Sequence, residues 1–186
     1  MQWVFFPLHP DTPAEGRSLA AMFAGRGVDL PAMHRQMADL MRAEGLPYSD
    51  RTHTYNSRLA QELGKWADTR GVKAIHDVLY RAYFVENRNI ADIEELVQLA
   101  GSVGLPSDEA RNVVLERRFK EAVDADWEKS RQNGVTGVPT FVSGKHVVVG
   151  AQPYDVLEQL VSTAGAIRRP QLTRQTSGGE EYIRER

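Results

Sequence analysis

Few side chains in this sequence have the types and spacing that catalysis or metal binding requires. The 186 residues include no cysteine, so this chain offers no thiolate for disulfide exchange or for a metal. The five histidines are not spaced along the chain as the ligands of a metal site are. They are His9, His34, His53, His76 and His146. We therefore expect no metal site and no cofactor in these residues.

The acidic pairs do not suggest a catalytic carboxylate dyad either. Glu94-Glu95, Asp108-Glu109 and the Asp124/Asp126 pair fit solvated helix faces and the positive ends of helices. The sequence contains no glycine-rich phosphate loop, nucleophile elbow or Ser-His-Asp set. These observations predict no catalytic residue.

Composition excludes several classes of partner. Hydrophobic residues make up 41% and charged residues 26%, with a net charge of -2. This balance is typical of a globular domain and gives no electrostatic reason for nucleic-acid or membrane binding. Since the first residues, Met1 to Pro7, lack a basic region and a long apolar run, they do not fit a signal peptide. We expect a cytoplasmic protein.

The most informative stretch is Val135 to Gly150. Two β-prone runs meet at Ser143-Gly144-Lys145, a pattern that predicts a hairpin. Pro139 can open the first strand but could not lie inside a central one. A helix is predicted after Pro153 from the spacing of apolar residues.

The rest of the chain is predicted to be mainly helical. Residues 2–8 are rich in β-formers and predict a strand. Between Gly16 and Asn133, apolar residues recur at helical spacing, with breaks at Gly71, Gly104 and near Arg117. Asp92 and Glu95 form a capping box, and Ser107 is expected to cap another helix.

The order of strand, helical block, proline-led hairpin and final helix resembles the DsbA-like thioredoxin-fold family, in particular its FrnE-type branch. The resemblance runs from about residue 2 to 164 and is carried by Phe6–Pro13 with Gly16, Leu79–Phe84, Gly134–Phe141 and Gly150–Pro153. It implies an α/β, thioredoxin-like fold with a large all-helical insertion. The incomplete thioredoxin-like subdomain would comprise residues 1–12 and 134–166, the insertion 13–133, and a disordered tail 167–186.

The resemblance also implies a binding site. In this family Pro139 would be a cis-proline that turns the backbone of Val138 outward. The N–H and C=O of Val138 could then pair with an extended peptide or protein substrate. Val138 and Pro139 are thus the expected substrate-binding residues.

The sequence departs from the family at its start, where the family has a strand and a Cys-x-x-Cys motif opening a helix. With this βα unit missing, two strands would show unpaired edges through which the chain could form a homo-oligomer. The recorded start could be a downstream methionine, the chain could be a natural truncation, or a partner could supply the strand. We favour the first explanation.

Three functions remain open at this point. The resemblance implies a thiol–disulfide oxidoreductase whose recorded chain lacks its redox cysteines, and is therefore inactive or N-terminally truncated. The first alternative is a redox-inactive peptide-binding or chaperone-like module. The second is an enzyme like 2-hydroxychromene-2-carboxylate isomerase, whose key residue would also lie in the missing unit. The FrnE-like strings favour the oxidoreductase. The sequence does not indicate the substrate, the redox direction or the oligomeric state.

Overall fold

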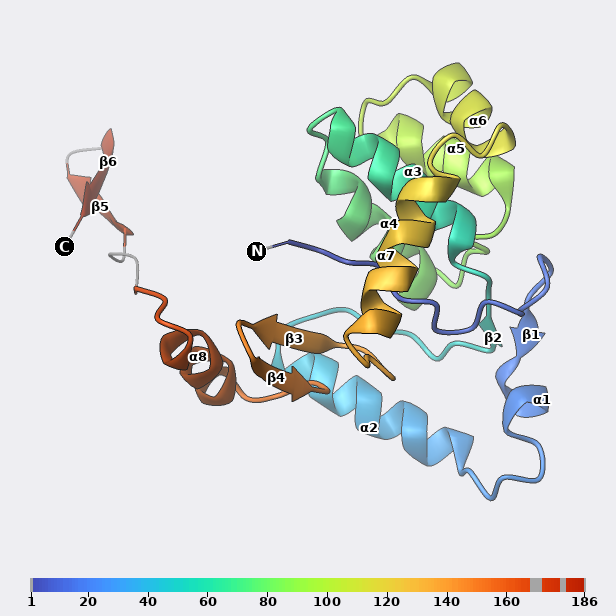
Figure 1. Ribbon diagram of the computed structural model, residues 1–186, viewed down its shortest axis with the longest axis horizontal. Helices are drawn as coiled ribbons and strands as arrows, with labels where there is room; N and C mark the ends of the chain where they lie inside the picture. The colour runs from blue at the N-terminus through green and yellow to red at the C-terminus, as the bar shows by residue number, and fades with distance from the viewer. Residues whose placement is uncertain (1, 168–171, 178–179, 186) are drawn as a thin grey trace. The chain divides into compact units, whose positions relative to one another are not determined.

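The computed structural model describes residues 2–167 and the backbone of residues 172–177 and 180–185. The chain divides into two compact units, Met1–Gly134 and Val135–Arg186. Figure 1 labels the elements of both units. The first unit contains the helical block, and the second contains the hairpin that follows Pro139.

The first unit is mainly helical, as the insertion was predicted to be. In chain order its elements are β1 (Arg17–Ser18), α1 (Leu19–Phe23), α2 (Leu30–Ala43), β2 (His53–Thr54), α3 (Arg58–Thr69), α4 (Ala74–Phe84), α5 (Ile93–Ser102), α6 (Ser107–Leu115) and α7 (Lys120–Gln132). The predicted break near Arg117 separates α6 from α7, and Arg117 has a positive φ of 54°.

Helix starts follow the predicted capping residues in one case and differ in another. The Glu95 N–H donates to Asp92 Oδ1 at 3.0 Å, so Asp92 caps α5 as predicted. Ser107, by contrast, is the first residue of α6, and Pro106 occupies the cap position. Proline fits there because its fixed φ suits the approach to a helix.

The hydrophobic core of the first unit lies among α3, α4, α5 and α6. Its largest fully buried apolar side chains come from all four helices and are Leu63, Ile75, Leu96, Val113 and Val114. Burying one such side chain stabilises a fold by about 1.5–3 kcal/mol. The apolar spacing that predicts these helices therefore also identifies the face of each that packs inward.

A buried carboxylate joins α3 to the turn before α7. Glu62 is fully buried and accepts hydrogen bonds from Arg58 Nε at 2.6 Å and from Arg117 Nε at 2.8 Å. Burial raises the pKa of Glu62, but the hydrogen bonds and charges of Arg117 and Arg58 outweigh it and hold the pKa below its usual value. Glu62 is therefore ionised near neutral pH.

The strand predicted for residues 2–8 does not form. Its backbone is instead held by side chains of α7 and α3: Phe5 N–H donates to Asp126 Oδ2 at 2.9 Å, and Phe5 C=O accepts from Ser130 Oγ at 3.1 Å. Gln61 Nε2 donates to Phe6 C=O at 3.2 Å. Within the described residues this segment pairs with no strand.

A short ladder inside the helical block was not predicted. Arg17 and Ser18 pair antiparallel with Thr54 and His53, inside the stretch where the sequence predicts mainly helix. The helix begins only at Leu19, after Ser18 Oγ accepts from the Ala21 N–H at 3.1 Å. Strands of two residues are too short to produce a recognisable periodicity.

The second unit is built on the predicted hairpin. β3 (Thr140–Ser143) pairs antiparallel with β4 (His146–Val149), joined by Gly144 and Lys145. Gly144 has a φ of +59°, which glycine adopts without strain. α8 (Tyr154–Thr163) follows and packs against β4.

The tail predicted to be disordered, residues 167–186, lies partly outside the described residues, at 168–171, 178–179 and 186. The remainder differs from the prediction, because β5 (Leu172–Ser177) pairs antiparallel with β6 (Glu180–Glu185). These strands contain Thr173, Tyr182 and Ile183, whose residue types favour β structure. The prediction of disorder gave more weight to the polar composition of the tail. The domain boundaries as a whole stay a prediction.

Replacing Leu63 by alanine should lower the free energy of unfolding by about 2–5 kcal/mol, because it leaves a cavity in this core. Leu115→Ala is the matched control, since Leu115 lies on α6 with 56% of its surface exposed. It should change stability by less than about 0.5 kcal/mol. Urea unfolding measures both, and equal losses would contradict the assigned core.

Glu62→Gln should destabilise the protein at pH 6 by about 3 kcal/mol, because two arginines lose their buried counter-charge. The folded pKa of Glu62 lies below the value of about 4.3 in an unfolded chain. Ionised Glu62 therefore stabilises the fold above about pH 4.3, and this contribution is lost as the pH falls through the folded pKa.

The stability difference between wild type and Glu62→Gln should accordingly shrink between pH 6 and pH 3, as measured by urea unfolding at each pH. Glu94→Gln is the control, because the Glu94 pair with Arg111 lies at the surface. That variant should stay close to wild type at pH 6. If the stability difference between wild type and Glu62→Gln did not vary with pH, the stabilising role of the Glu62 charge would be contradicted.

Candidate functional site

The candidate site is the segment that leads into β3. The peptide bond between Val138 and Pro139 is cis. Pro139 C=O accepts a hydrogen bond from the Gly150 N–H at 2.8 Å, which extends the hairpin ladder by one pair. Thr140 Oγ1 donates to Gly137 C=O at 2.7 Å. These two bonds hold the segment on both sides of Val138.

Val138 has unpaired main-chain groups. Among the residues that the structure describes, neither its N–H nor its C=O has a hydrogen-bond partner. Its side chain is also open to solvent, with 49% of the residue surface exposed. An N–H and a C=O at one exposed residue can bind another extended backbone, so this position suits the binding of a peptide.

The structure thus brings Val138 and Pro139 together with Gly137, Thr140 and Gly150. No role is predicted from the sequence for Thr140 or Gly150. A two-residue turn at Gly144 and Lys145 sets the register of the whole hairpin, so the pairing of Pro139 with Gly150 could have been derived from it. No pattern in the sequence predicts the hydrogen bond that the Thr140 hydroxyl donates.

Three of the histidines have polar partners that they do not share. His76 Nε2 lies 2.8 Å from Asp68 Oδ1, His34 Nδ1 lies 3.8 Å from Asp50 Oδ1, and His53 Nδ1 lies 2.9 Å from Thr52 Oγ1. Within the described part of the chain, no group of three or more histidine, cysteine or acidic side chains could hold a metal ion. In the same residues, no helix is long and apolar enough to cross a bilayer.

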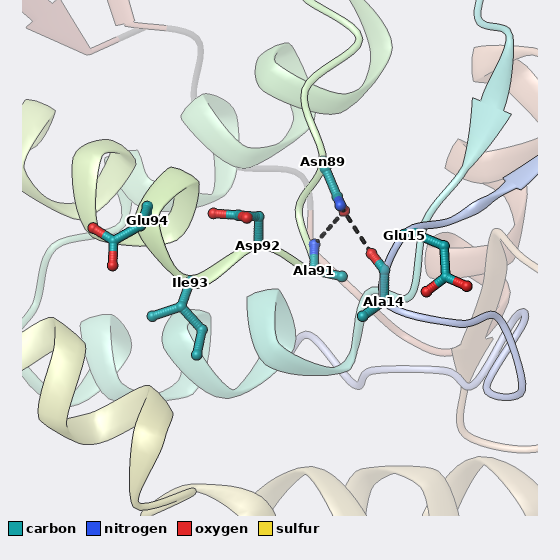
Figure 2. Close-up of a pocket in the computed structure, with 7 residues that line it drawn as sticks. All are labelled: Ala14, Glu15, Asn89, Ala91, Asp92, Ile93 and Glu94. Carbon is teal, nitrogen blue, oxygen red and sulfur yellow. Dashed lines mark hydrogen bonds between the residues drawn. The ribbon is translucent and has the colours of Figure 1, made fainter.

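A hollow lies in the first unit, and none of the residues that line it belongs to the hairpin. It has a volume of about 500 Å³ and is open to solvent. Figure 2 shows Asn89 joining its two sides, donating to Ala14 C=O at 2.8 Å and accepting from Ala91 N–H at 2.9 Å. Asp92 caps α5, and Glu94 pairs with Arg111. These polar groups serve the local fold, so the hollow gives no sign of a ligand site.

Comparison with known proteins identifies the family. A model of the DSBA-like thioredoxin domain matches residues 1–162. The chain belongs to the DSBA-like thioredoxin domain family. It therefore has the α/β thioredoxin-like fold with a helical insertion that the sequence predicts.

Solved structures agree with this assignment. A probable DsbA oxidoreductase from Streptomyces coelicolor is 30% identical, with a TM-score of 0.79 over 97% of this chain and 83% of that chain. A putative protein disulfide isomerase from Nitrosomonas europaea is 19% identical, with a TM-score of 0.58 over 72% of each chain. The second likeness supports the fold alone.

One curated relative also matches. YwbO of Bacillus subtilis (strain 168), an uncharacterized protein, is 32% identical over 85 residues. The match spans 45% of this chain and 42% of YwbO, less than half the length of either protein. The DsbA family is thus assigned to this chain, while its 186 residues contain no cysteine with which to exchange disulfides.

Thr140→Val should loosen the Pro139 segment, because it removes the hydroxyl that donates to Gly137 C=O. A hydrogen bond of this kind contributes about 1 kcal/mol, so the Gly150 amide should exchange with solvent about five times faster. Thr140→Ser keeps the hydroxyl and is the matched control. Hydrogen exchange followed by NMR measures both variants, and unchanged exchange in Thr140→Val would show that the hydroxyl does not hold the segment.

Proposed function

We propose that this chain carries the polypeptide-binding part of a DsbA-family thiol–disulfide oxidoreductase of the FrnE type. Val138 would hold an extended substrate through its N–H and C=O, beside Pro139. The observation that carries the proposal is the exposed, unpaired backbone of Val138 at the start of β3. The DSBA-like family match over residues 1–162 supports it.

The chemistry of the family limits what these residues can do. Disulfide exchange requires a thiolate that attacks one sulfur of a disulfide, forms a mixed disulfide and releases the other sulfur as a thiolate. No cysteine among the 186 residues can supply this thiolate. The role of this chain is then to bind and orient the substrate backbone, while all three reacting sulfurs come from other molecules or segments.

The absence of cysteine specifically favours a second candidate. A module that binds extended peptides without redox chemistry would use the same Val138 backbone and would need no thiol. The two candidates therefore share a binding site and differ in whether the bound peptide can undergo exchange on this protein.

Fragment complementation separates the two candidates. The purified chain is mixed with a synthetic strand–Cys-x-x-Cys–helix fragment of the family, and the reduction of insulin disulfides is measured. The oxidoreductase proposal expects activity above the sum of the separate components. Peptide binding by the chain without any such gain would favour the redox-inactive module, and the absence of binding would contradict both.

Val138→Pro should weaken the binding of an extended peptide at least tenfold, because proline has no N–H to donate. Val138→Ala keeps both main-chain groups and should bind within about threefold of wild type. Fluorescence anisotropy of a labelled peptide measures both affinities, and circular dichroism verifies that both variants are folded. Equal affinities for the two variants would argue against a main-chain contact at this residue.

A further inference from the structure

We propose that Arg51 binds the carboxylate of a small aromatic acid, and that the exposed ring of Tyr80 packs against the apolar part of this ligand. Arg51 lies in the connector between α2 and β2. The site therefore belongs to the first unit and goes beyond the proposed function, which concerns Val138 in the second.

Arg51 is a half-buried cation without a counter-ion. The half-buried arginines of the described residues are Arg51, Arg58, Arg88 and Arg111. The last three each bind a glutamate, namely Glu62, Glu95 and Glu94, respectively. In the same part of the chain, the Arg51 side chain has neither a salt bridge nor a hydrogen bond. Because a cation removed from water is costly without a partner, this position favours a ligand that brings a negative charge.

The guanidinium of Arg51 has one accessible nitrogen. Nε and Nη1 are buried and have no hydrogen-bond partner among the described residues, whereas Nη2 is not closed off from solvent. The desolvation of Nε and Nη1 has already taken place in the folded chain, and no internal bond must break when a ligand reaches Nη2. An anionic acceptor gains most at such a group, since charge-assisted hydrogen bonds are about twice as strong as neutral ones.

Two aromatic rings hold the guanidinium in place. Its central carbon lies 4.5 Å from the ring centre of Tyr83 and 4.9 Å from that of Phe84. These cation–π contacts stabilise the charge but provide no oxygen or nitrogen acceptor for the N–H groups. The hydrogen-bonding capacity of Arg51 is therefore left for a ligand.

Hydrogen bonds fix the chain on both sides of Arg51. Ser49 N–H donates to Phe84 C=O at 3.2 Å. Thr54 is buried, and its Oγ1 lies 3.2 Å from the Tyr83 hydroxyl. The arginine and its two rings are thus held before any ligand arrives, so binding requires little further ordering of the protein.

The charges and rings around Arg51 indicate the class of ligand. The adjacent acidic residue, Asp50, is exposed, and its Oδ1 lies 3.8 Å from His34 Nδ1. A phosphate dianion would be repelled by this carboxylate more strongly than a singly charged carboxylate ligand. The Tyr80 ring stacks beside Phe84 at 6.0 Å between centroids and is 58% exposed. An aromatic group joined to the ligand's carboxylate would cover this ring, so benzoate is the simplest member of the class.

The first test compares benzoate with benzamide on the wild-type chain. Benzamide keeps the ring and replaces the carboxylate by a neutral amide. Titration to about 20 mM, followed by NMR of the Tyr83 and Phe84 ring protons, covers the millimolar affinity expected of one charged contact. Benzoate should shift these signals to saturation and bind at least tenfold more tightly than benzamide. Acetate, which lacks the ring, and inorganic phosphate should each bind at least threefold more weakly than benzoate.

Two protein variants complete the experiment. Arg51→Gln removes the charge and should reduce benzoate affinity at least tenfold, to the level of benzamide. Arg35→Gln is the matched control, because Arg35 is an exposed arginine on α2 of the same unit, and it should bind benzoate within about twofold of wild type. Circular dichroism verifies the fold of both variants. If Arg51→Gln does not fold, the comparison of the two ligands on the wild-type chain still decides.

The outcomes separate a ligand site from a purely structural arginine. Equal binding of benzoate and benzamide, or no binding of either, would overturn the proposal. So would benzoate shifts that Arg51→Gln leaves unchanged, because the carboxylate would then be held elsewhere. Phosphate or acetate bound as tightly as benzoate would overturn the assigned class of ligand. None of these results depends on peptide binding at Val138, so failure of either proposal leaves the other standing.

Discussion

Main-chain hydrogen bonding is the constraint on which the two units of this protein depend. Every N–H and C=O removed from water needs a partner, and an extended segment without a neighbouring strand has few to offer. In the first unit, side chains supply these partners. Asp126 and Ser130 of α7 form hydrogen bonds with both main-chain groups of Phe5. Among the described residues of the second unit, the main-chain groups of Val138 have no partner, which is why a binding function is proposed there.

The helical unit keeps these side chains in place through a series of polar contacts. Glu62 binds Arg58 and Arg117, and so fixes α3 against the turn that starts α7. Arg58 also lies 4.5 Å from the Trp127 ring, and Trp127 Nε1 donates to Gln61 Oε1 at 2.8 Å. The side chains that bond Phe5 lie on α7. Loss of the Glu62 charge is therefore expected to destabilise the N-terminal segment as well as the core.

Much of the fold could be predicted from the sequence because it follows from periodicity. The hairpin at Gly144, the α5 cap at Asp92 and the helical block all follow from local patterns. The strand expected at residues 2–8 could not be judged in this way, since a strand exists only if a neighbour pairs with it. Two-residue strands such as β1 and β2 are set by tertiary contacts instead.

The candidate site was predictable in part. Val138 and Pro139 were identified through the family resemblance, and the structure adds Gly150 and Thr140 as the groups that hold them. The hydroxyl of Thr140 could not be assigned in advance, because its bond to Gly137 depends on the turn geometry.

The most direct test of the account is amide hydrogen exchange on the second unit, with and without a saturating extended peptide. The account predicts that the Val138 amide becomes protected on binding. The Phe141 and Val148 amides, already paired in the hairpin, should change little. Protection that appears on α8 while the Val138 amide continues to exchange freely would contradict the central claim.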